Sequence, residues 1–176
     1  MKAAPIRQAI RDVLEGASGR YASRMAGLFV YGTFDGQPAQ TTAALALRAT
    51  HTFDVVLGEV SPHEASPAGV RGSYRLQTLL VTVRVWTRLP PANAPDKRSD
   101  VVAGVSEHLD LAILALGEPE ALTYTAGDEA TGIVSGIMRS PDGTGYPDVT
   151  EGEYDWQALL ATHEIRGRAI VRVDRP

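Results

Sequence analysis

The chain has 176 residues, of which 44% are hydrophobic, with a net charge of −4 at pH 7 and no cysteine. This length suits one domain with its own core. The composition excludes a disulfide framework, thiolate zinc sites, a cysteine nucleophile and nucleic-acid binding driven by overall positive charge. The sequence shows no signal-peptide pattern, and no apolar run reaches the roughly 18 residues of a membrane helix. We therefore expect a soluble protein that is made in the cytoplasm and has no membrane partner.

The N-terminal segment predicts an amphipathic helix over residues 4–15, which Gly16 ends. A short strand is expected at residues 28–34, and one or two helical turns at residues 41–49. The apolar positions of the first helix recur at helical spacing on one face: Ile6, Ile10, Val13 and Leu14.

Two antiparallel strands are expected next. The first covers residues 51–60, and a loop rich in glycine and proline at residues 61–73 joins it to Tyr74–Arg88. The second strand gives the clearest periodic signal of the chain, because apolar residues alternate with mixed ones. Its length of roughly 45 Å far exceeds the usual five or six residues. Such a strand extends beyond its own domain or lies along a neighbouring subunit.

A long helix is predicted over residues 100–116, with Ser99 or Asp100 as its cap. The proline-rich residues 90–100 are predicted to be a non-helical connection. The helix carries one apolar stripe and must cover the sheet; the stripe comprises Val101, Val102, Val105, Leu109, Ala112, Ile113 and Leu116.

The C-terminal third predicts strands at residues 121–125, 132–139 and 161–173. Residues 140–156 are expected to form an acidic surface loop that contains no Lys, Arg or core residue and that either is mobile or orders on a partner. Together these elements predict a single α+β domain over residues 1–176, with a mostly antiparallel sheet and two main helices packed on one face.

No constellation of residues indicates catalysis, a cofactor or a metal. The four histidines are expected to stand alone as structural residues: His51, His63, His108 and His163. The acidic loop does not fit the spacing of a calcium loop, and no phosphate-binding glycine motif or nucleophile elbow is present. We therefore expect that the protein is not an enzyme.

Two charged segments are the candidate assembly surfaces. Arg166, Arg168 and Arg172 share the outer face of the last strand. The acidic loop carries Asp148, Glu151 and Glu153 without a countercharge of its own. Opposite charges on separate elements suit contacts between subunits or between stacked rings.

The order of these elements resembles the small tail terminator proteins of long-tailed bacteriophages, also described as tail completion or tail-to-head joining proteins. The sequences that carry the resemblance are VVLGE, GSYRLQTLLVTVRVWTR, SDVVAGVSEHLDLAILAL and HEIRGRAIVRV, within residues 1–126 and 160–174. Residues 140–156 are a longer insertion than this family is expected to have.

The resemblance implies a structural protein without catalysis or cofactor. It implies a hexameric ring on the last ring of the tail tube, which stops tube polymerisation and contacts a head or neck connector protein. Genomic DNA passes through such a ring without specific binding, and the ring belongs to the head-proximal end of the virion tail after assembly in the host cytoplasm. Three other readings stay open: another head–tail adaptor, a small enzyme with a site built by residues 61–73 and 140–156, and a nucleic-acid-binding domain.

Overall fold

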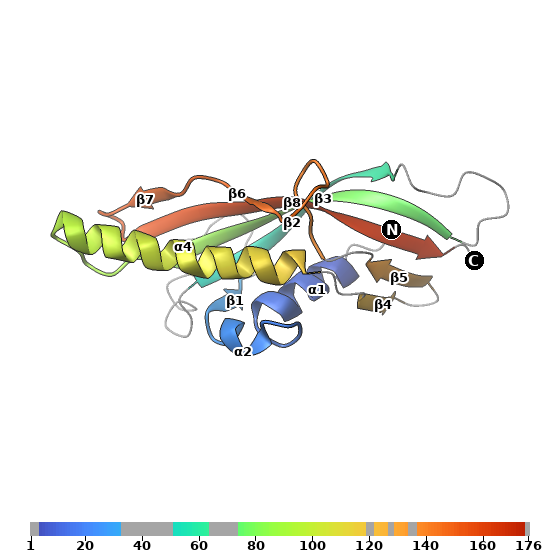
Figure 1. Ribbon diagram of the computed structural model, residues 1–176, viewed down its shortest axis with the longest axis horizontal. Coiled ribbons are helices and arrows are strands. Elements are labelled where there is room, and N and C mark those ends of the chain that lie inside the picture. Colours follow the sequence, from blue (N-terminus) through green and yellow to red (C-terminus); the bar gives the residue numbers. More distant parts are fainter. Residues whose placement is uncertain are drawn as a thin grey trace.

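The computed structural model describes residues 4–32, 51–63, 74–118, 122–126, 129–133 and 137–174 (Figure 1). The protein has an α+β fold with a mostly antiparallel mixed sheet and two main helices, as the sequence predicts. The helices are α1 (Ala4–Leu14), α2 (Ala22–Met25) and α4 (Pro95–Gly117). The strands are β1 (Phe29–Tyr31), β2 (His51–Pro62), β3 (Tyr74–Arg88), β4 (Leu122–Ala126), β5 (Glu129–Ile133), β6 (Asp148–Val149), β7 (Glu153–Asp155) and β8 (Leu160–Asp174).

The centre of the sheet is a ladder between β3 and β8. These strands have 15 residues each and pair antiparallel from Tyr74↔Asp174 to Arg88↔Leu160 without a register shift. At about 3.3 Å per residue, the ladder spans about 50 Å and forms the long axis of the molecule in Figure 1. The predicted strands Tyr74–Arg88 and 161–173 are confirmed.

The strand β2 pairs antiparallel with β3, and β1 adds to β2 in parallel. A register shift between Leu57 and Val60 marks a bulge, which leaves Gly58 and Glu59 outside the ladder. The expected strand at residues 51–60 is confirmed and runs to Pro62, whereas the helical turns expected at residues 41–49 lie outside the described residues.

Four short segments complete the other edge of β8. From one end to the other, β8 faces β5, an isolated bridge at Arg139, then β6 and β7. All four run antiparallel to β8 and act together as one interrupted strand. Most of residues 140–156 form surface turns, as predicted, but the prediction of a loop is wrong for Asp148–Val149 and Glu153–Asp155, which are strands. This segment also contains the buried Ser140 and the partly buried Val149, which packs on the core.

Sequence patterning missed β6 and β7 because each has two or three residues, too few for a period of two to emerge. The strand expected at residues 132–139 is β5, which begins earlier, at Glu129, and ends at Ile133. Its hairpin partner β4 agrees with the strand expected at residues 121–125, to within one residue.

The core lies between one face of the sheet and the helices α1 and α4. The predicted apolar stripe of α1 is buried, and Gly16 follows the helix with φ of +75°, where a side chain would meet the backbone of Ala22 and Ala26. Full burial of a Leu or Ile side chain contributes about 1.5–3 kcal/mol, so this stripe is a main attachment of α1. The alternate residues of β3 face the same core: Leu79, Val81, Val83 and Val85.

The helix α4 starts earlier than predicted, at Pro95 rather than at residue 100. Its N-cap is Ala94, without a side-chain hydrogen bond, so the prediction of Ser99 or Asp100 as cap is wrong. Proline is well suited to the first helical position, since the amide it lacks has no partner there. Val105, Leu109, Ala112 and Leu116 of the predicted stripe are buried, while Val102 is 36% exposed.

Candidate assembly surfaces

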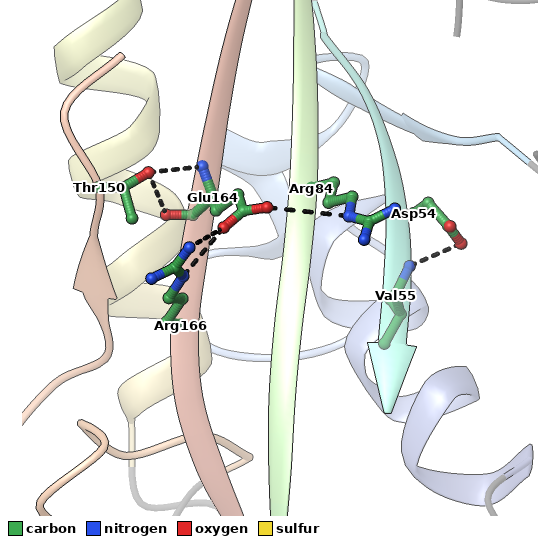
Figure 2. Close-up of polar contacts among 6 residues, drawn as sticks. All are labelled: Asp54, Val55, Arg84, Thr150, Glu164 and Arg166. Carbon is green, nitrogen blue, oxygen red and sulfur yellow. Dashed lines mark hydrogen bonds and ion pairs between the residues drawn. The ribbon is translucent and has the colours of Figure 1, made fainter. Parts of the chain in front are cut away.

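A row of alternating charges crosses the outer face of the sheet, opposite the helices (Figure 2). Asp54 of β2, Arg84 of β3 and Glu164 of β8 occupy one row, because Arg84 is the register partner of both carboxylates. Arg84 Nε lies 3.8 Å from Glu164 Oε1, and Arg166 Nε donates to Glu164 Oε2 at 2.9 Å. These ion pairs are solvent-exposed, so each contributes about 0.2–1 kcal/mol or less.

Each end of this row is also tied to the backbone. Asp54 accepts a hydrogen bond from the Val55 amide at 2.8 Å rather than an ion pair from Arg84. The Thr150 hydroxyl accepts a hydrogen bond from the Glu164 amide at 3.1 Å and donates one to the Glu164 carbonyl at 3.3 Å (Figure 2). The Thr150 amide also donates to this carbonyl, at 2.9 Å. These bonds hold the Glu164 backbone in place at the β8 end of the row.

The predicted basic row lies against the predicted acidic segment. Asp148 is the register partner of Arg166, and the Arg168 guanidinium donates to the Asp142 carbonyl. Residues 140–156 contain no Lys or Arg of their own, as expected, but Arg166 and Arg168 of β8 lie beside this segment. For Arg172 the structure describes only the backbone, which belongs to β8 and pairs with Leu76 of β3.

The loop that meets Arg168 is internally ordered. Asp142 accepts hydrogen bonds from the Ser140 hydroxyl, and from the amide and hydroxyl of Thr144, both at 2.8 Å. These bonds, that of Ser140 above all, lower the pKa of Asp142 to about 2. Gly143 has φ of +87° and lies directly against the Arg168 guanidinium, where any side chain would clash.

Glu151 and Glu153, the remaining predicted interface residues, are exposed. Neither forms an ion pair within the part of the chain that the structure describes. Glu153 belongs to β7, and Glu151 lies in the turn between β6 and β7. The structure therefore does not join these two carboxylates to the basic row.

Glu151 borders a groove of about 360 Å³ between α4 and the β6–β7 segment, which we call the acidic groove. One wall is α4, with Val102, Ser106, Leu109 and Asp110; the other is residues 149–152 with Tyr154. Two carboxylates and no Lys or Arg are present among the residues that line it. His163 of β8 closes the inner end.

A stack of aromatic side chains supports this groove. The Tyr154 hydroxyl lies 3.3 Å from His163 Nε2, and Trp156 stacks on Tyr154 with centroids 6.2 Å apart. Arg98 of α4 lies over the Trp156 ring at 5.1 Å. This chain of contacts ties β7 to the first turns of α4, so that both walls of the groove are fixed.

Gly152 allows the groove wall to approach His163. A Cβ atom at this position would lie 2.0 Å from His163 Nε2. His163 is 5% exposed, and its Nδ1 has no hydrogen-bond partner among the described residues. Burial lowers the pKa of His163 and raises that of Tyr154. His163 is thus a buried structural histidine whose Nε2 has a hydrogen-bond partner and whose Nδ1 has none among the described residues.

The prediction that the histidines stand alone is wrong for two others. His51 Nε2 of β2 lies 2.9 Å from His108 Nδ1 of α4, and His51 Nδ1 lies 2.7 Å from the Thr87 hydroxyl. Burial, followed by the neighbouring His108 and His163, lowers the pKa of His51 to about 3. Sequence spacing gave no sign of this cluster, because 57 positions separate its two bonded histidines.

A second, smaller hollow of about 180 Å³ lies on the outer surface of α1. We call the residues that line this hollow the arginine face. Arg7, Gln8 and Arg11 of α1 line it together with Tyr31 of β1. Arg11 is paired with Glu15 at 2.9 Å and lies 5.1 Å over the Tyr31 ring. Tyr31, which lies outside α1 in the sequence, supplies the aromatic floor of this hollow.

The described residues contain no group of three or more His, Asp or Glu side chains that could hold a metal ion. Across the same residues, no helix is both long and apolar enough to cross a membrane. Fold and surface together describe an α+β protein with charged side chains on the outer face and along the edges of its sheet. No protein-family model matches the chain, and no curated protein matches it.

Proposed function

We propose that this protein is a tail terminator of a long-tailed bacteriophage, which forms a hexameric ring on the last ring of the tail tube. The ring stops tube polymerisation and contacts a head or neck connector protein. The observation that carries this proposal is the edge of β2. From Asp54 to Pro62, this edge has no strand neighbour among the described residues, since β1 pairs only with residues 51–53.

An open strand edge presents unpaired backbone donors and acceptors to another chain. Here the edge belongs to a sheet with a central ladder of about 50 Å, so a neighbour that joins it rests on a long, rigid support. The bulge between Leu57 and Val60 interrupts the regular edge and restricts which strands can pair with it. These features suit a specific subunit contact rather than open-ended aggregation.

The outer face of the sheet supports a role in which DNA passes the ring without tight binding. Tight binding of DNA depends on cations that neutralise phosphates. On this face Arg84 and Arg166 already lie against Glu164, and Arg168 lies against the Asp142 carbonyl. Phosphates would have to displace these partners.

Native mass measurement of the purified protein tests the assembly part of this proposal. We expect a hexamer, or a concentration-dependent ring that converges on six copies. A DNA titration at two salt concentrations separates the proposal from a nucleic-acid-binding domain, because tight binding that weakens steeply with salt would favour the latter. Binding to isolated heads but not to tail tubes would favour another head–tail adaptor.

A further inference from the structure

The acidic groove and the arginine face lie at opposite edges of the sheet. The arginine face includes Tyr31 of β1, which pairs with β2 at one edge. The acidic groove is built on β6 and β7, which pair with β8 at the other edge. Between them lie β2, β3 and β8 in that order (Figure 1). Two copies placed side by side in the same orientation therefore bring the arginine face of one toward the acidic groove of the next.

The groove has the chemistry to receive a cationic side chain. Asp110 and Glu151 are exposed on its two walls, and no cation lines it. Val102, on the same wall as Asp110, adds an exposed apolar surface that suits the aliphatic part of an arginine. The Tyr154 hydroxyl, whose pKa is raised by burial, stays neutral near pH 7 and accepts hydrogen bonds.

The arginine face has a side chain available for such a contact. Arg11 already donates a hydrogen bond to the Glu15 carboxylate and lies over the Tyr31 ring. The hydrogen bond to Glu15 raises the pKa of Arg11. Arg7 is exposed, and within the described residues it forms no ion pair. Four residues, about one helical turn, separate Arg7 from Arg11, so both project from the same side of α1.

We infer that the acidic groove binds the arginine face of a second copy of this chain, with Arg7 placed between Asp110 and Glu151. This inference deepens the proposed function, on which it rests, by naming the two surfaces of the ring contact. The contact is heterologous, since two different surfaces meet, and it closes into a ring when the rotation between copies permits. The charges also orient the approaching subunits.

Charge reversal tests this contact in the full-length protein. Arg7→Glu makes both surfaces acidic, and the double variant Asp110→Arg/Glu151→Arg makes both basic. We expect each variant alone to sediment as a monomer where the wild type is oligomeric. An equimolar mixture should recover the oligomer, because each surface of one variant then meets the opposite charge on the other. Alternating copies can close a ring that has an even number of subunits.

Glu107→Arg is the matched control, because Glu107 is an exposed carboxylate of α4 that does not line the groove. This variant should keep the wild-type oligomer. Circular dichroism of every variant should match the wild type, since all four positions are exposed.

Three results would overturn the inference: a wild type that stays monomeric at every concentration, single variants that keep the oligomer, or a mixture that stays monomeric. The proposed function fails separately. If the mixture recovers the oligomer but neither it nor the wild type caps tail tubes, the contact stands and the tail-terminator assignment falls.

Discussion

His51 Nε2 and His108 Nδ1 lie 2.9 Å apart and join the strand β2 to the long helix α4. The ring of Phe29 stacks on the His51 ring with centroids 4.6 Å apart, and the Thr87 hydroxyl forms a hydrogen bond with Nδ1 of His51. In the pair, one imidazole must donate and the other must accept, which two neutral rings satisfy. A proton added to His51 removes its acceptor and places a charge in the core.

The two buried histidines His51 and His163 predict a loss of stability in mild acid. The pKa values of His51 and His163 are lowered in the folded protein, whereas unfolded histidine titrates near 6.5. Below pH 6.5 the unfolded state therefore binds more protons than the folded state. Below pH 6.5 we expect the free energy of unfolding to fall by up to about 1.4 kcal/mol per pH unit on account of His51, with a further contribution of the same sign from His163. Urea titrations between pH 7 and 5 measure this fall.

The variant His51→Gln separates the titration from the packing. It should lower stability at pH 7 but give a flatter dependence on pH. Val83→Ala is the control, since it removes buried apolar volume without a titrating group and should keep the wild-type slope. An unchanged slope in His51→Gln would contradict the role given to His51.

The core side of α4 predicts a contrast between two valines. Val105 is 4% exposed, so Val105→Asp buries an unpaired carboxylate and should prevent folding. Val102→Asp, three residues earlier, should stay folded and lose about 0.5 kcal/mol or less, as is usual at exposed positions. Circular dichroism and thermal unfolding measure both. A folded and stable Val105→Asp protein would mean that α4 does not pack on the sheet as described.

Two glycines should respond in opposite directions to alanine. Gly152→Ala places a Cβ atom against the His163 ring and should destabilise the protein by about 1–3 kcal/mol. Gly104→Ala on α4 meets nothing within 4 Å and should stabilise it by up to about 1 kcal/mol. Equal effects in denaturant titrations would argue against the close contact between Gly152 and His163.

Removal of residues 140–156 should destabilise the fold severely. The deletion takes away β6 and β7, opens the edge of β8 and uncovers the core beside Val149. Replacement of Glu151 and Glu153 by Gln in the intact segment is the control and should leave stability within about 0.5 kcal/mol of the wild type. A deletion variant with wild-type thermal stability would show that these strands are dispensable.

The sequence predicted the elements whose pattern repeats several times. β3, β8 and α1 have enough residues for an alternating or helical period to stand out, and their buried faces agree with that period. The start of α4 was missed because proline was read as a helix breaker, although Pro95 occupies the first turn.

The candidate assembly surfaces and the histidine pair could be predicted less well from the sequence. The pairing of Asp148 with Arg166 depends on the register of a two-residue strand, and the bond between His51 and His108 depends on the position of α4 over β2. Neither relationship is encoded in local spacing. Charge composition did identify Glu151 as an interface candidate, but not the groove that it borders.

The capping of tail tubes is the most direct test of the proposed function. Purified protein is mixed with polymerising tail tubes from the same source, and tube lengths and ends are recorded by negative-stain electron microscopy. A tail terminator gives a ring at one end of each tube and arrests its growth, while Arg7→Glu protein gives neither. Tubes that lengthen as they do without the protein, with bare ends, would contradict the proposed function.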